Sequence, residues 1–229
     1  MDTIAIPYLF SVLCLAPALG VFAWDYLRRN KTVPKNKRYA SGIALQAWLF
    51  VFTMAAASAE KIDLFSTSLP SLKAWVCGAV FLVTVLLWAR FTWARVDQSA
   101  KQRLRIFLPE TPKEFLAWVP VAIMAGLAEE CAYRGAAYDL LRLMGVTSFY
   151  AVGACTIAFA VCHLYQGWRA TVKIGILGLV SQAAVFLTGS LYVSIAVHAA
   201  YDLLIVWLVM QLLSRDSTGS RHPEAVLSG

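Results

Sequence analysis

The amino-acid sequence predicts an all-α fold, a polytopic transmembrane helical bundle with about seven spans. Composition is the first reason: of 229 residues 60% are hydrophobic and only 14% are charged, and the mean hydropathy is +0.66. Patterning is the second, because the hydrophobic residues fall in blocks of about 18 or more with few charges, long enough to cross a bilayer as helices.

Seven such blocks are separated by short polar segments. They cover about 4–27, 41–59, 72–93, 112–145, 148–165, 170–187 and 191–213. The fourth block opens with Thr111-Pro112, which is typical of a helix N-cap followed by proline at the first helical position, and Gly145 is its expected stop. The N-terminus lacks the positive region of a signal peptide, so the first block is expected to remain as a span.

The basic excess, a net charge of +7, is concentrated in two loops. One holds Arg28, Arg29, Lys31, Lys35, Lys37 and Arg38, and the other holds Arg95, Lys101, Arg103, Arg105 and Lys113. Because each loop lies between apolar spans, the positive-inside rule explains them better than nucleic-acid binding does. We therefore expect an integral protein of a prokaryotic inner membrane, with its N-terminus outside and its C-terminus cytosolic, and with lipids as contacts.

Five cysteines are odd in number, lie in apolar segments and show no CxxC spacing. They are interpreted as small buried hydrophobic residues rather than disulfides or a zinc site.

The strongest functional signal is a group of three ionisable residues, Glu129, Glu130 and Arg134, in a run that is otherwise apolar back to Phe115. Such groups cost about 2.5–3.5 kcal/mol each in a membrane helix, so they persist where they pair or line a functional cavity. Glu130 and Arg134 stand four apart on one helix face, while Glu129 points about 100° away. The spacing predicts that the arginine holds Glu130 and leaves Glu129 free.

The later spans carry a second set of polar residues, His163, His198 and Asp202. His198 and Asp202 are four apart, as are Phe159 and His163, so each pair shares a helix face. Three helices can thus contribute to one pocket. Histidines and a free carboxylate suit a hydrolase, which needs a base for water and donors for the oxyanion.

Three spaced motifs occur in order on successive hydrophobic segments: Glu129-Glu130-x-x-x-Arg134, Phe159-x-x-x-His163 and His198-x-x-x-Asp202. Together they resemble the motifs of the CPBP family, which comprises CAAX prenyl endopeptidases and bacteriocin-processing (Abi) intramembrane proteases. The resemblance covers about 115–213. Three parts are therefore expected: 1–110 with N-terminal transmembrane spans and basic cytosolic loops, and 111–214 as a CPBP-like catalytic core. The third part, 215–229, is short and polar and is expected to be a disordered cytosolic tail.

The resemblance also implies roles for the site residues in a glutamate-dependent peptide hydrolysis. Glu129 is the expected general base, and His163 helps to hold and activate the water. His198 and the residue at 202 form the oxyanion site. The expected substrate is a protein or peptide with a lipid-anchored or membrane-proximal tail.

Three further residues are expected to support the site. Glu130 and Arg134 orient the helix and set the local charge, and a purely structural ion pair is the favoured interpretation of this pair. Phe159 is expected to pack beneath the pocket.

Position 202 departs from the family pattern, which often has asparagine there. An ionised aspartate donates no hydrogen bond and would repel an oxyanion. Either Asp202 is protonated, or it orients His198 and stabilises the charged imidazole. The second role is favoured, and it leaves His198 as the main oxyanion donor.

Several alternatives remain open. Zinc could be bound by Glu129, His163 and His198, with Asp202 as a further ligand, although no H-E-x-x-H spacing is present and no cofactor is expected. A thiol protease using Cys162 is disfavoured because adjacent helical residues diverge. The same pocket could belong to a catalytically inactive peptide-binding or immunity protein, or to a transporter, for which internal repeats would be expected.

Overall fold

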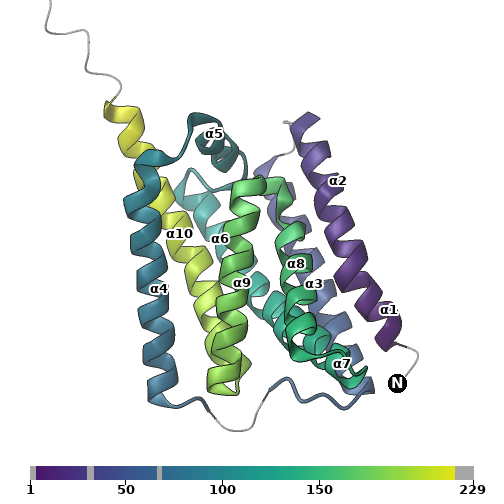
Figure 1. Cartoon of the computed structure of the whole chain (residues 1–229). Helices are drawn as coiled ribbons and strands as arrows, with labels where there is room; N and C mark the ends of the chain where they lie inside the picture. The colour runs from purple at the N-terminus through teal and green to yellow at the C-terminus, as the bar shows by residue number, and fades with distance from the viewer. Residues whose placement is uncertain (1–3, 30–33, 66–68, 220–229) are drawn as a thin grey trace, which may run out of the picture.

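The computed structural model describes residues 4–29, 34–65 and 69–219, and all regular secondary structure in these ranges is helical. The elements, labelled in Figure 1, are α1 (Ala5–Phe10), the π-helical η1 (Ser11–Leu15), α2 (Ala16–Arg29), α3 (Lys35–Ala59), α4 (Leu72–Thr92), η2 (Trp93–Arg95), α5 (Gln98–Phe107), α6 (Pro112–Glu129), the π-helical η3 (Glu130–Ala136), α7 (Ala137–Leu143), α8 (Ser148–Cys162), η4 (Leu164–Gln166), α9 (Trp168–Thr188) and α10 (Leu191–Gly219).

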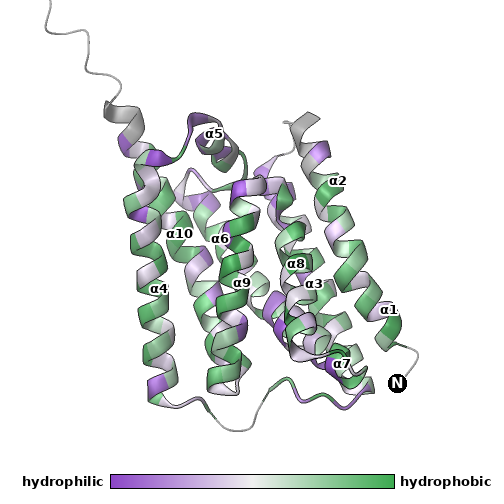
Figure 2. Cartoon of the chain, viewed as in Figure 1, coloured by the Kyte–Doolittle hydropathy of each residue, from purple (hydrophilic) through white to green (hydrophobic). Residues whose placement is uncertain are grey.

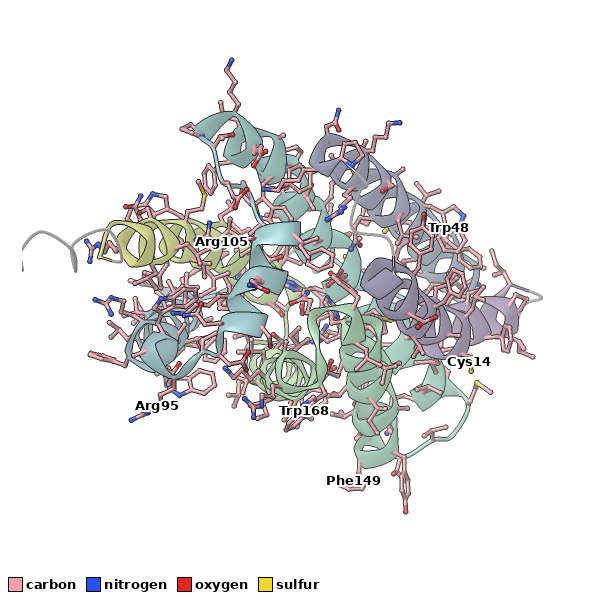
Figure 3. The ribbon with its side chains drawn as sticks, turned by 90° about the horizontal axis from the view of Figure 1, so that it is seen from above. Cys14, Trp48, Arg95, Arg105, Phe149 and Trp168 are labelled. Atoms are coloured by element: carbon pink, nitrogen blue, oxygen red, sulfur yellow. The ribbon has the colours of Figure 1, made fainter. Side chains whose placement is uncertain are left out.

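The predicted fold class is confirmed. Within the described residues six helical segments are long and apolar enough to cross a membrane, and α8 is a shorter apolar helix beside them. Figure 2 shows hydrophobic residues along the length of the helices. At the periphery, seen from the α5 end in Figure 3, large apolar side chains point outward, among them Trp48, Phe149 and Trp168. The chain is an integral membrane protein.

Three elements differ from the sequence expectation. Helix α3 begins at Lys35 rather than at residue 41, so it includes part of the first basic cluster. The second basic loop contains the amphipathic helix α5, whose N-cap Asp97 accepts a hydrogen bond from the backbone of Ala100. Helix α8 has only 15 residues, about 22 Å, and ends at Cys162 instead of crossing the full bilayer.

Both basic segments lie at the same end of the bundle, the upper end in Figure 1, where α10 also ends. This agrees with a common cytosolic side for the two loops, and the orientation itself stays a prediction. Helix α10 continues to Gly219, so it includes the first residues of the tail predicted to be disordered. The rest of that tail, 220–229, and Lys31 of the first basic cluster lie outside the described residues.

The fourth predicted block is one continuous helical rod made of α6, η3 and α7. Thr111 caps it by accepting a hydrogen bond from the backbone N–H of Glu114, with Pro112 at the first helical position. The rod ends where Gly145 adopts φ +83°, as predicted. The π-helical segment interrupts the α-helical hydrogen bonding at Glu130, directly after the first glutamate.

The first span supports this π-helical segment from the side. The hydroxyl of Tyr8, which is fully buried, donates to the carbonyl oxygen of Ala132 at 3.2 Å and lies 3.1 Å from Oγ1 of Thr53 on α3. The hydroxyl of Tyr133 donates to the carbonyl of Val12 at 3.4 Å. The N-terminal spans therefore form one packed core with the segment that carries the glutamates.

Candidate active site

The side chains that the sequence singled out meet at one place in the bundle. Glu129 is the last residue of α6, His163 follows the end of α8, and His198 lies on α10. Oε2 of Glu129 stands 3.9 Å from Nε2 of His163 and 3.7 Å from Nε2 of His198. Three segments far apart in the sequence thus present their polar groups to a common point.

Glu130 lies behind this point and is saturated with partners. Its side chain is fully buried, and it accepts hydrogen bonds from Nδ1 of His198 at 2.7 Å and from the hydroxyl of Ser194. Nη1 of Arg134 lies 3.3 Å from the same carboxylate, so the predicted ion pair is present. A buried carboxylate needs this many partners because its desolvation would otherwise be prohibitive.

In the structure Glu130, and not Asp202 as the sequence predicted, makes the hydrogen bond that orients the His198 ring. Oδ2 of Asp202 is 3.8 Å from Nε2 of His198, too long for a hydrogen bond, whereas the Glu130 contact to Nδ1 is short. Asp202 instead adds a third carboxylate near the ring, an arrangement that stabilises positive charge on His198. The reason is geometric: the i, i+4 spacing brings the two groups together but does not aim the oxygen at the nitrogen.

Glu129 is less free than the sequence predicted. Nε2 of Gln46, on α3, donates to its Oε1 at 2.5 Å. Its other oxygen, Oε2, is buried and has no hydrogen-bond partner among the described residues. One oxygen of this carboxylate is therefore held by α3, and the other faces the two histidines.

His163 is oriented by the end of its own helix. Its Nδ1 lies 2.8 Å from the carbonyl oxygen of Phe159, so we assign the Nδ1–H tautomer, which leaves Nε2 as an acceptor facing Glu129. The ring packs against that of Tyr165, and Phe107 of α5 packs on Tyr165 in turn. Gly167, with φ +102°, turns the chain from η4 into α9.

Phe159 packs against Arg134 and both histidines of the site. Its ring lies under the guanidinium of Arg134 at 4.0 Å, and it contacts the ring of His163 at 4.8 Å between centroids. Gly178 on α9 closes this contact, because a Cβ there would lie 2.8 Å from Nη2 of Arg134 and 3.3 Å from Phe159. Arg134 and the Phe159 ring can pack against α9 here because position 178 has no side chain.

Sequence reasoning missed two residues of the site, Gln46 and Ser194. Ser194 precedes His198 by four residues, so the facing pattern that linked His198 to Asp202 could have found it. Gln46 is the single amide in the apolar block 41–59, and that exception was its only signal.

The arrangement suits activation of a water molecule. A water between Oε2 of Glu129 and Nε2 of His163 would meet two acceptors for its two hydrogens, which leaves its lone pairs available for attack. Tetrahedral zinc would place its ligands roughly 3.3 Å apart, since each lies about 2.0 Å from the metal. The observed separations are wider, and no group of three or more metal-binding side chains was found in the described part of the chain.

Comparison with known families agrees with this geometry. Residues 111–204 match the family of type II CAAX prenyl endopeptidase Rce1-like proteins, and this range includes the glutamates, both histidines and Asp202. This match agrees with the resemblance of the sequence motifs to the CPBP family. No curated protein and no solved structure matched the chain. The matched segment begins at the N-cap of α6 and extends through most of the first half of α10, so Gln46 lies outside it.

Proposed function

We propose that this protein is an intramembrane endopeptidase that hydrolyses a peptide bond near the membrane-proximal end of its substrate, with Glu129 as the general base. One observation carries the proposal: Oε2 of Glu129 is buried, accepts no hydrogen bond from the residues that the structure describes and faces Nε2 of both histidines. An orphaned carboxylate oxygen is costly in a membrane protein and is best explained by a ligand that donates to it.

The reaction follows from these positions. Glu129 takes a proton from the water that His163 helps to hold, and the water oxygen attacks the scissile carbonyl carbon. His198, charged within its set of carboxylates and held by Glu130, donates Nε2–H to the oxyanion. Glu129 then returns the proton to the leaving nitrogen, and the C–N bond breaks.

The family match and the location of the site support a proposal for the substrate class. CAAX endopeptidases act on peptides, and a site built within a helical bundle requires a chain that is itself held at the membrane. We propose a protein or peptide with a lipid-anchored or membrane-proximal tail as the partner.

The test is mass-spectrometric mapping of new protein termini in membranes that contain the wild type or Glu129→Gln at matched levels. Termini present only with the wild type are the expected result, and they also identify the substrate and the cleaved bond. Identical profiles with both proteins folded would favour the inactive peptide-binding or immunity alternative.

The zinc variant of the mechanism has a separate test. Wild-type membranes are treated with a chelator before the reaction, and termini are counted as before. Cleavage should be unchanged if the mechanism needs no metal. If the chelator abolishes cleavage and added zinc restores it, the enzyme uses zinc.

A further inference from the structure

Gln46 belongs to the N-terminal spans, outside the matched segment, yet its side chain reaches the active site. We infer that Gln46 is an active-site residue that holds Glu129 with its amide N–H and accepts a backbone N–H of the bound peptide with its amide oxygen. This inference rests on the proposed function, because it concerns how the same site hydrolyses a peptide.

The first half of the inference follows from one short contact. Nε2 of Gln46 donates to Oε1 of Glu129 at 2.5 Å, and a hydrogen bond to an ionised acceptor is stronger than one between neutral groups. An ionised carboxylate can only accept, so the amide must turn its nitrogen toward Glu129. The amide oxygen consequently points away from that carboxylate.

This hydrogen bond fixes the plane of the carboxylate. With Oε1 held by α3, Oε2 remains directed at His163 and His198, which stand 3.9 and 3.7 Å away. A carboxylate free to rotate would hold this position only part of the time, and misplacement of about 1 Å can cost a hundredfold in rate. Gln46 is in this respect a positioning residue.

The second half follows from an unsatisfied atom. Oε1 of Gln46 is buried and has no hydrogen-bond partner among the described residues, like Oε2 of Glu129 beside it. Buried acceptors are normally paired, so two of them on neighbouring side chains indicate a ligand that brings donors. Water can satisfy Glu129, and a second donor is needed for Gln46.

A peptide substrate supplies that donor. A peptide bond is attacked in an extended segment, and the backbone N–H groups of such a segment lack partners where little water is present. The amide oxygen of Gln46 offers an acceptor next to the base. It would therefore help to hold the substrate in the extended form that hydrolysis requires.

The first experiment compares matched substitutions of two glutamines in the mapping of termini described above. Gln46→Met keeps the length of the side chain and removes both polar atoms. Gln182→Met is the control, because Gln182 on α9 is likewise buried and its Nε2 likewise lacks a hydrogen-bond partner among the described residues, whereas only Gln46 of the two donates to Glu129 there. We expect termini to form about 10- to 100-fold more slowly with Gln46→Met. Equal rates for Gln46→Met and the wild type would overturn the inference.

A second readout does not depend on activity. Dicyclohexylcarbodiimide labels carboxyl groups inside apolar protein segments, and loss of the hydrogen bond from Gln46 leaves both oxygens of Glu129 open to the reagent. Labelling of Glu129, measured by peptide mass spectrometry, should increase in Gln46→Met and stay unchanged in Gln182→Met. Unchanged labelling in both variants would overturn the positioning role, even if the wild type proved not to cleave.

The contact to substrate is tested with synthetic peptides spanning the mapped bond, in which single backbone amides are replaced by esters. With the wild type, one replacement should lower kcat/KM because the donor to Gln46 is lost. In Gln46→Met the same replacement should cost nothing further. A penalty of equal size in both proteins at every position would overturn this contact while leaving the protease assignment intact.

Discussion

Two carboxylates adjacent in the sequence occupy opposite environments. Glu130 is enclosed by Arg134, His198 and Ser194, so its charge is balanced and it has no capacity left for a substrate. One oxygen of Glu129, in contrast, accepts no hydrogen bond within the described part of the chain. The pair therefore separates two tasks, since Glu130 sets the orientation of a histidine and Glu129 remains available for chemistry.

This division of tasks predicts a mild effect of Asp202→Asn. Asp202 makes no hydrogen bond to His198, and Glu130 already orients that ring. An asparagine amide could in addition donate to an oxyanion. We expect the variant to keep activity within about tenfold of the wild type, measured as the rate at which mapped termini appear.

The matched comparison is Glu130→Gln, which removes the buried charge that Nδ1 of His198 and Arg134 face. This variant should lose most activity because it leaves Arg134 as an uncompensated buried charge. Complete loss in Asp202→Asn, with the variant folded, would contradict the assignment of orientation to Glu130.

Among the individual residues of the site, the sequence pointed to Glu129, His163 and His198, because ionisable residues are rare and costly in apolar spans. The sequence pointed to Asp202 as the residue that orients His198, because the two are four residues apart on one helix. It could not show that Glu130, on another helix, makes this hydrogen bond instead. Gln46 was missed because its contact with Glu129 joins helices that are distant along the chain, and no local pattern records such packing.

Two helical irregularities place the site. Helix α8 ends early, so His163 leaves the helix inside the protein rather than at its surface. The π-helical segment from Glu130 to Ala136 follows Glu129 immediately, and such segments are frequent at functional sites. The sequence predicted a continuous helix from its cap to its glycine stop, but the periodicity of apolar residues could not reveal a π-helical turn within it.

Helix α6 and helix α10 approach closely at Gly126. A Cβ at this position would lie 2.8 Å from the backbone nitrogen of Ala199, next to His198. We therefore expect Gly126→Ala to push the helices apart, to separate Glu129 from His198 and to lower cleavage about 100-fold, since misplacement of about 1 Å has effects of this size. The measurement is again the rate of appearance of mapped termini.

Gly153→Ala on α8 is the matched control, because a Cβ there meets no atom within 4 Å. It should leave activity unchanged and raise stability slightly, since alanine is favoured over glycine in a helix by roughly 0.5–1 kcal/mol. Equal activity in Gly126→Ala and Gly153→Ala would show that the close approach of α6 and α10 is not needed for the site.

For the whole molecule, hydropathy predicted the order of the seven apolar helical segments, six of which are long enough to cross a membrane, because the cost of burying charge in lipid acts on every residue of a span. Tertiary packing determined the rest. Tyr8 on the first span and Thr53 on α3 contact each other against the π-helical segment, so the N-terminal spans are part of the structure that holds the glutamates. The family match begins at residue 111, but the packed core extends across this position.

The orientation of the molecule yields the last prediction. The two basic segments share one end of the bundle, and the positive-inside rule places that end in the cytosol. In a variant without native cysteines, Leu69→Cys in the exposed segment before α4 should react with a membrane-impermeant maleimide in intact spheroplasts. Gln102→Cys on α5 should react only after permeabilisation. The reverse labelling pattern would place α5 outside the cell. A cytosolic peptide tail would then have to reach Glu129 from the end of the bundle that lies opposite to α5.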